Sequence, residues 1–215
     1  MDPRLRNPIP TLFVDTQFVS PYALSAFVAL TEKRVEFELQ RVDLTAQQNQ
    51  QPPFQQLSLT ARVPTLDYDG FSLSESSAIV EFVEEEFAPP RYRSVFPADR
   101  RHRARARQLQ AWLRSDLMAL RAERPTTVFF ATEPAPPLTS DGKDAAGKLL
   151  RVAASLLRDG SQDLFGAWSI ADTDLAVMLN RLVAGGDRVP EAVRVYVGRQ
   201  WERPSMQKWR ELVRL

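Results

Sequence analysis

The chain carries the stretch TLFVDTQFVSPY at residues 11–22, and this stretch decides how its first half folds. Its first residues are apolar and predict a strand at residues 10–14. Ser20 and Pro21 then predict a helix over residues 20–33, because serine caps free N–H groups and proline suits the first helical position. The Ser20 hydroxyl would lie at the positive end of a helix, a place that favours an anion. A cap with no further role is the alternative.

The composition excludes several kinds of site. The 215 residues are 44% apolar and 26% charged, with no cysteine and one histidine, His102. This excludes disulfides, thiolate metal sites, a protein thiol nucleophile and most Ser–His catalysis. We expect no metal and no permanently bound cofactor, and a nucleophile supplied by a co-substrate. With neither a secretory signal nor an apolar run of membrane length, we expect a cytoplasmic protein without membrane contacts.

The first ninety residues alternate between strand and helix patterns. Residues 35–39 alternate in polarity and predict a second strand, and the Gln-rich residues 45–62 predict a loop with a short irregular helix. Residues 63–73 predict two strands joined at Asp69-Gly70, a dipeptide typical of hairpin turns. A helix then opens at residues 74–77. The order βαβαββα is that of a thioredoxin-like domain, with the first two strands parallel and the hairpin antiparallel.

The apolar pattern in the second half of the chain predicts helices and no strands. We expect an α+β chain made of a thioredoxin-like domain, a proline-containing linker and an all-α helical bundle, with boundaries at residues 1–88, 89–98 and 99–215. Apolar residues at helical spacing mark four helices. The four stripes are Leu109 to Leu120, Leu149 to Leu157, Leu175 to Val183, and Met206 to Val213.

Two segments of the helical half are distinctive. The Pro-rich residues 124–141 contain Val128-Phe129-Phe130, which could cover either a site or the core, and we favour a lid over a site. Ser169-Ile170-Ala171-Asp172 fits a capping box, in which Asp172 reaches back to the N–H of the cap. We therefore expect Asp172 to serve folding and not catalysis.

Charge is unevenly spread along the chain. Residues 1–90 contain 6 basic and 13 acidic residues, whereas residues 91–215 contain 22 and 14. Such asymmetry is typical of a basic partner surface or of two parts that attract each other. The basic run Arg100–Arg107 fits a solvated helix face, since the total charge is near neutral and no nucleic-acid module is recognisable. We expect no nucleic-acid partner.

Four motifs in order now resemble the glutathione S-transferase family over nearly the whole chain. They are Ser20-Pro21-Tyr22, Arg62-Val63-Pro64, Glu75-Ser76 and Ser169–Asp172. The start of the chain is most similar to that of bacterial members with a Ser-Pro-Tyr motif, which the family associates with glutathione transfer and peroxide reduction. The resemblance implies glutathione as co-substrate and a small hydrophobic electrophile or a hydroperoxide as second substrate.

In this family the residue matching Ser20 donates a hydrogen bond to the glutathione sulfur and stabilises its thiolate. Lowering a thiol pKa from about 8.5 by two units requires roughly 2.7 kcal/mol. A hydrogen bond to a charged group supplies about 1.5–3 kcal/mol, and a helix N-terminus adds about 0.3–1 kcal/mol. The two effects suffice without a general base. Since this chain has no cysteine, its chemistry would be direct attack by bound glutathione.

The resemblance implies roles for five further residues. Val63-Pro64 matches a cis-proline turn that presents the Val63 backbone to glutathione like an added strand, and we favour a cis bond over an ordinary trans proline. Ser76 would hold the γ-glutamyl carboxylate and Glu75 its ammonium group. Arg62 would meet the glycyl carboxylate, although relatives often have glycine where Ala61 stands here.

The second-substrate site is expected between the domains. Its candidates are Tyr22, Trp112, Ser115, Asp116 and residues 128–130, although Trp112 also fits a core position. Relatives form two-fold dimers, and the opposite charges of the two halves would favour such a homodimer. The competing interpretation is a non-catalytic binding or regulatory protein that keeps the fold. Retention of Ser20, Glu75 and Ser76 together favours the enzyme.

Overall fold

The computed structural model describes residues 8–131, 133–157 and 161–213, which divide into two compact units. Residues up to Arg93, together with the end of the chain from Glu211, form the first, here called the N-terminal unit. Residues Ser94–Arg210 form the second, here called the helical unit. The fold is therefore α+β, with all described strands in the N-terminal unit.

The N-terminal unit is built on a four-stranded sheet in the order β2-β1-β3-β4. The strands are β1 (Thr11–Asp15), β2 (Glu38–Val42), β3 (Thr65–Tyr68) and β4 (Phe71–Ser74). β1 and β2 are parallel, while β1 with β3 and β3 with β4 are antiparallel. Asp69 and Gly70 join the hairpin with φ of 52° and 77°, as a type I′ turn requires. These pairings confirm the predicted thioredoxin-like arrangement.

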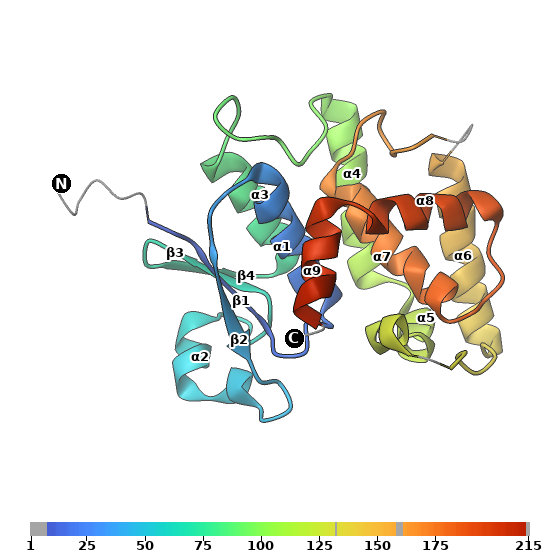
Figure 1. Cartoon of the computed structure of the whole chain (residues 1–215), viewed down its shortest axis with the longest axis horizontal. Helices are drawn as coiled ribbons and strands as arrows, with labels where there is room; N and C mark the ends of the chain where they lie inside the picture. Colours follow the sequence, from blue (N-terminus) through green and yellow to red (C-terminus); the bar gives the residue numbers. More distant parts are fainter. Residues whose placement is uncertain (1–7, 132, 158–160, 214–215) are drawn as a thin grey trace. The chain divides into compact units, whose positions relative to one another are not determined.

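Helices cover both faces of this sheet. They are α1 (Pro21–Lys33), the 3-10 helix η2 (Gln48–Gln50), α2 (Pro52–Leu57) and α3 (Ser76–Glu86). Figure 1 shows α1 and α3 on one face and α2 on the other. The Phe13 ring meets the Phe54 ring of α2 at 5.9 Å between centroids. Because side chains alternate along a strand, the fully buried Leu12 and Val14 point to the face that α1 and α3 cover.

The second strand lies three residues later than predicted. Residues 35–37 alternate because they close α1 and not because they pair in the sheet. Arg34 is left-handed at φ 58°, and the Val35 N–H donates to the Leu30 carbonyl, as in a Schellman helix end. Val35 is buried, and the Phe37 ring packs edge-on against Phe27. Pairing with β1 begins only at Glu38.

The helical unit is arranged around one buried helix. Its elements are α4 (Arg100–Ser115), α5 (Met118–Glu123), the 3-10 helix η3 (Thr126–Phe130), α6 (Ser140–Leu156), α7 (Ile170–Ala184), α8 (Glu191–Trp201) and α9 (Pro204–Val213), whose end belongs to the other unit. α7 contacts α4, α6, α8 and η3 and is buried along most of its length. α8 was not predicted, although Val193, Tyr196 and Val197 have helical spacing after Pro190.

The stripe from Leu109 to Leu120 is interrupted, which corrects the expectation of one continuous helix. α4 ends at Ser115 and α5 begins at Met118. The Leu117 N–H donates to the Asp116 carboxylate at 2.6 Å, and Leu117 adopts a left-handed φ of 63°. A short acidic side chain that bonds the next N–H competes with the helical ladder and ends it.

Residues 128–130 cover the core more than they cover a site. Val128 is buried, and the Phe129 ring packs edge-on against Trp201 of α8 at 5.5 Å. Phe130 is 44% exposed. Val128 is thus a core residue and Phe129 is half-buried against α8 of the same unit, which favours a covering of the core over a lid.

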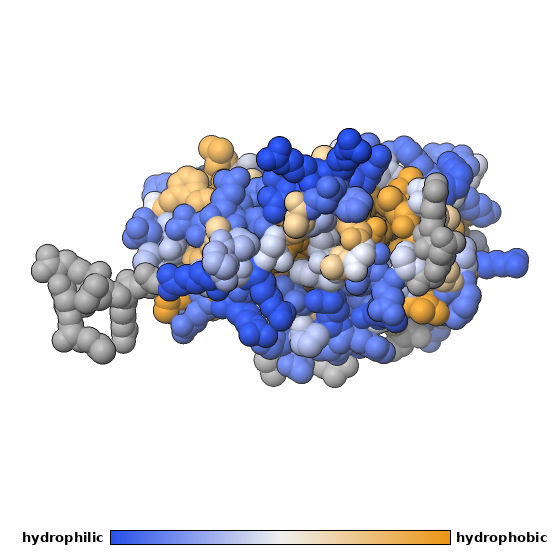
Figure 2. Space-filling view, turned by 90° about the horizontal axis from the view of Figure 1, so that it is seen from above, coloured by the Kyte–Doolittle hydropathy of each residue, from blue (hydrophilic) through white to orange (hydrophobic). Residues whose placement is uncertain are grey.

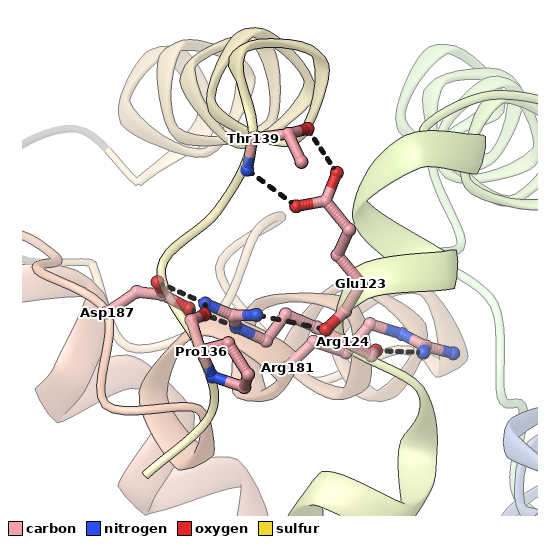
Figure 3. A network of polar contacts seen from close by, with 6 residues as sticks. All are labelled: Glu123, Arg124, Pro136, Thr139, Arg181 and Asp187. Carbon is pink, nitrogen blue, oxygen red and sulfur yellow. Dashed lines mark hydrogen bonds and ion pairs between the residues drawn. The ribbon is translucent and has the colours of Figure 1, made fainter.

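A polar network around the buried Arg124 and Arg181 joins α5, α6 and α7 to the loops between them (Figure 3). It contains Glu123, Arg124, Pro136, Thr139, Arg181 and Asp187. Arg124 donates to the Asp187 carboxylate and to the Pro136 carbonyl, and Arg181 donates to the Arg124 carbonyl. The Glu123 carboxylate accepts from the Thr139 N–H and hydroxyl at the start of α6.

The surface is mostly polar. On the face in Figure 2, hydrophilic side chains predominate and hydrophobic residues form small separate groups. Within the described ranges, no helix combines the length and the apolarity needed to cross a bilayer.

Candidate functional site

The strand register brings three predicted segments to one end of the sheet. Phe13 of β1 pairs with Thr65 of β3, and Thr65 pairs with Ser74 of β4. The loop after β1, the turn before β3 and the residue after β4 therefore meet there. These segments carry Ser20, Val63-Pro64 and Glu75-Ser76. α1 and α3, which pack together, both begin at this end, so two positive helix ends face it.

Ser20 is the N-cap of α1, as predicted. Its backbone is extended, with φ −69° and ψ 116°, and its Oγ accepts the Ala23 N–H at 3.2 Å. Pro21 occupies the first helical position. The residue is half-buried, and no described residue accepts the proton of its hydroxyl. This hydroxyl can therefore donate to a ligand while its oxygen remains bonded to the helix.

Asp15 braces the loop that carries Ser20. Its carboxylate accepts the Val19 N–H at 2.7 Å and the Ser20 N–H at 3.1 Å, and its carbonyl accepts the Phe18 N–H at 3.1 Å. Asp15 is only 3% exposed. The sequence prediction missed this residue, although an aspartate at a strand end five residues before an N-cap was an available signal.

The turn before β3 contains a cis Val63-Pro64 bond, which confirms the expected isomer. Within the described chain, no hydrogen bond engages the N–H or the carbonyl of Val63. The loop is held from the side, because the Thr65 hydroxyl donates to the Arg62 carbonyl at 2.8 Å and Asn49 donates to the Ala61 carbonyl. Ala61 has φ 51°, so it adopts the left-handed conformation that glycine favours. The Arg62 side chain is exposed.

Glu75 and Ser76 open α3, as predicted. Glu75 is the N-cap by position, with φ 74° and ψ 114° and no capping bond from its side chain. Such a backbone in a non-glycine residue costs about 1–3 kcal/mol and is typical of sites where a ligand is held. The Glu75 side chain is exposed, whereas Ser76 is buried at the first helical position.

The candidates in the helical unit form a smaller group around Trp112. Its Nε1 donates to the Asp116 carboxylate at 2.8 Å, Lys148 forms an ion pair with the same carboxylate, and Lys148 lies 5.9 Å from the indole centroid. The Lys148 hydrogen bond, followed by the Leu117 N–H and Trp112, lowers the pKa of Asp116 to about 2. Lys148 was not predicted, because it lies 32 residues away in sequence.

The remaining candidates are not brought into this group. The Ser115 hydroxyl is exposed and donates back to the Ala111 carbonyl at 3.0 Å. A pocket of about 320 Å³ between α4 and α6 is lined by Trp112 and Lys148 but not by Ser115 or Asp116. Tyr22 is half-buried in the first turn of α1, within the N-terminal unit.

Asp172 has the folding role that was expected. It is fully buried, and its carboxylate accepts the Ser169 N–H at 2.9 Å, the Leu164 N–H at 2.8 Å and the Tyr196 hydroxyl at 3.0 Å. Burial raises its pKa to about 6.

Comparison with known proteins gives matches over both units. The family model "Glutathione S-transferase, N-terminal domain" matches residues 19–86, and "Glutathione S-transferase, C-terminal domain" matches residues 99–214. Human glutathione S-transferase theta-1 is 29% identical over 198 residues, which cover 88% of this chain and 76% of that protein. Human theta-2 is 30% identical over 101 residues, which cover 47% of this chain and only 40% of that relative's length.

Solved structures extend this likeness. A glutathione transferase homolog from Burkholderia, with bound glutathione, is 49% identical with a TM-score of 0.81, and the match covers 95% of this chain and 98% of that one. A delta-class glutathione transferase from Nilaparvata lugens is 20% identical with a TM-score of 0.73, over 95% and 98% of the two chains. At that identity the second likeness concerns the fold alone.

Proposed function

This chain belongs to the glutathione S-transferase family, and we propose that it binds glutathione and uses the thiolate of this tripeptide to attack small electrophiles. The single observation that carries the proposal is the hydrogen bonding of the Ser20 hydroxyl. Its oxygen is bonded to a helix N–H, while no described residue takes its proton. The bound glutathione in the Burkholderia homolog supports the choice of co-substrate.

The Ser20 hydroxyl is suited to stabilise a thiolate. Because Oγ accepts the Ala23 N–H, the hydroxyl is polarised and becomes a better donor through hydrogen-bond cooperativity. The N-terminus of α1 adds a positive potential at the same place. The thiolate is the reactive form of a thiol, so its stabilisation at neutral pH activates glutathione without a general base.

The rest of the site would hold the tripeptide backbone. The unengaged N–H and carbonyl of Val63 suit strand-like pairing with glutathione beside cis-Pro64. The N-terminus of α3 and Ser76 suit the γ-glutamyl carboxylate. The exposed Glu75 suits the ammonium group, and Arg62 suits the glycyl carboxylate.

Two reactions follow from a bound thiolate. With an aryl halide, sulfur attacks the ring carbon, the carbon–sulfur bond forms, and halide leaves with the electrons of the carbon–halogen bond. With an organic hydroperoxide, sulfur attacks the terminal oxygen and the O–O bond breaks. The sulfenic acid of glutathione forms, and the departing alkoxide takes a proton from water to give the alcohol. A second glutathione thiol then converts the sulfenic acid to the disulfide with release of water. The peroxidase reaction is part of this proposal.

The direct test is a titration of the thiol of bound glutathione by ultraviolet absorbance of the thiolate. We expect a thiol pKa below about 8.5, the value for a free thiol, and a return toward that value in Ser20→Ala. Turnover should fall strongly in this variant while glutathione affinity changes little. Ser25→Ala is the control, because it makes the same substitution five residues further along the chain, within α1.

The outcome separates this proposal from its alternative. An unshifted thiol pKa in the unmodified protein, with glutathione bound, would mean a non-catalytic binding or regulatory protein. An assay panel of an aryl halide, an organic hydroperoxide and an isothiocyanate would identify the second substrate. Trp112, Asp116, Ser115 and Tyr22 remain candidates for that substrate's site, and alanine variants would change the KM of the second substrate alone.

We also propose a homodimer. The basic α4 exposes Arg100, Arg101, Arg105 and Arg107, whereas α3 exposes Glu85 and Glu86. Opposite charges on two surfaces of one chain favour two-fold pairing. Sedimentation should give a dimer that weakens as salt is raised, and a monomer at moderate protein concentration and low salt would contradict it.

A further inference from the structure

We propose that Asp15 is a positioning residue for Ser20, holding the backbone of the β1–α1 loop so that the Ser20 hydroxyl faces the glutathione sulfur. This inference rests on the proposed function of Ser20. Asp15 itself would not contact the substrate. Its role would be to hold Ser20, which makes that contact.

The main evidence is the convergence of three successive N–H groups on one residue. The Phe18 N–H donates to the Asp15 carbonyl, and the Val19 and Ser20 N–H groups donate to the two carboxylate oxygens at 2.7 and 3.1 Å. Neither Val19 nor Ser20 lies within a helix or strand. Their N–H groups need acceptors where water is scarce, and the Asp15 side chain supplies both.

The surroundings indicate that this carboxyl serves the loop. Asp15 is 3% exposed, and no cation of the described residues pairs with it. A buried carboxyl whose partners are two backbone N–H groups defines the path of that backbone. Phe18, at φ 54°, is buried at the turn of the same loop with the Arg41 guanidinium 5.0 Å from its ring. The loop is thus held at two points, and Asp15 is the one bonded to Ser20.

The sign of the effect distinguishes positioning from simple electrostatics. Removing a negative charge near a thiolate would by itself lower the pKa of the thiol. Loss of the Asp15 hydrogen bonds to the loop would displace Ser20, weaken the hydrogen bond from its hydroxyl to the glutathione sulfur, and raise the pKa of the thiol. A positioning role therefore predicts a rise toward about 8.5 in Asp15→Ala. Misplacement of a reacting group by about 1 Å can cost a factor of about 100 in rate, so we expect kcat to fall about 10- to 100-fold while the KM for glutathione changes less.

The experiment compares Asp15→Ala, Asp15→Asn and Ser20→Ala with glutathione as the probe. The readouts are the thiol pKa of bound glutathione, kcat and KM, and amide hydrogen exchange at residues 19 and 20. Asparagine keeps one acceptor oxygen, so it should rescue part of kcat and slow the amide exchange relative to alanine. It also keeps the shape of the side chain and carries the test if Asp15→Ala does not fold.

Glu84→Gln is the control for general loss of stability. Glu84 lies in the third turn of α3, in the same unit, and its buried carboxylate accepts a hydrogen bond from Lys33 of α1. The Glu84→Gln variant should lower the unfolding midpoint without changing the thiol pKa of bound glutathione. If Ser20→Ala raises the thiol pKa but folded Asp15 variants leave it unchanged or lower it, the positioning role is wrong and the proposed function stands. If Ser20→Ala leaves the thiol pKa unchanged, the proposed role of Ser20 fails and this inference with it, whereas an unshifted thiol pKa in the unmodified protein would overturn the proposed function itself.

Discussion

Arg124 and Asp187 form a two-point ion pair in the helical unit. Nε lies 2.7 Å from Oδ2 and Nη2 lies 2.8 Å from Oδ1, and the Arg124 side chain is only 2% exposed. The hydrogen bond to Asp187 raises the pKa of Arg124. Because Arg124 also donates to the Glu123 and Pro136 carbonyls, it satisfies four acceptors across two loops.

We expect Arg124→Lys to destabilise the protein although it keeps the charge. An ammonium group cannot reproduce the planar fork of the guanidinium, and at least one buried acceptor would lose its donor. A loss of about 1–3 kcal/mol in the free energy of unfolding is expected, measured by urea denaturation. The same exchange at the exposed Arg101 of α4 is the control and should stay within about 0.5 kcal/mol. Equal effects at the two positions would contradict this prediction.

Lys33→Met should be strongly destabilising, because it removes the cation from a buried ion pair. The Lys33 ammonium is buried, 2.7 Å from the Glu84 carboxylate and 2.8 Å from the Arg93 carbonyl. Removing one member of a buried pair costs about 3–5 kcal/mol. Replacing both, as Lys33→Met with Glu84→Leu, should recover much of this loss, since apolar pairs are often equivalent to buried ion pairs. Denaturant unfolding of Lys33→Met, Glu84→Leu and the double variant tests this, and additive losses would count against it.

Asp172 predicts a pH dependence of stability between about pH 4 and 6. Burial raises its folded-state pKa from 3.8 to about 6. The folded protein thus binds this proton more tightly than the unfolded chain does. Its stabilising contribution is complete below pH 4 and is lost as the pH rises through 6. The change is on the order of 3 kcal/mol.

The measurement compares the unmodified protein with Asp172→Asn. The variant loses an acceptor oxygen and is less stable overall, but the asparagine amide does not titrate in this range. The difference in unfolding free energy between the two proteins should shrink as pH rises from 4 to 6.5. Parallel pH profiles would show that Asp172 keeps an ordinary pKa in the folded state.

Substitutions at Glu75 can separate the effect of the strained backbone at this position from the effect of the Glu75 carboxylate. At φ 74° an alanine remains strained, whereas a glycine does not. Glu75→Gly should therefore be more stable than Glu75→Ala by about 1 kcal/mol. Both lack the carboxylate proposed to hold the ammonium of glutathione, so both should bind glutathione equally weakly in calorimetry. A variant that binds as tightly as the unmodified protein would exclude the charge role.

Much of the site's backbone was predictable because its signals are local. Ser20 and Pro21 form an N-cap and a first helical position through contacts within one turn. Asp69-Gly70 specifies the hairpin by its two left-handed residues. The capping role of Asp172 also acts over three residues. Each of these features depends on residues that are close in sequence, so the sequence alone is enough to predict it.

The errors arose where local patterns have two explanations. The alternation of Val35 and Phe37 fits a strand, yet these residues seal the end of α1. The apolar stripe past Leu113 fits one helix, yet Asp116 bonds the next N–H and ends it. Val128 and Phe129 fit a lid, yet they pack on their own unit. In each case a tertiary contact or a side-chain hydrogen bond outweighed periodicity.

The amino-acid sequence by itself determined the thioredoxin-like order of elements, the helical second half, and the identity of Ser20, Val63-Pro64 and Glu75-Ser76, because helix caps, turns and periodicity act over a few residues. Only the tertiary structure decided that Ser20, Val63-Pro64 and Glu75-Ser76 meet at one end of the sheet, that Lys148 joins Trp112 and Asp116, and that Lys33 is buried against Glu84. These pairings depend on strand register and helix packing, which bring together groups that no short-range pattern connects.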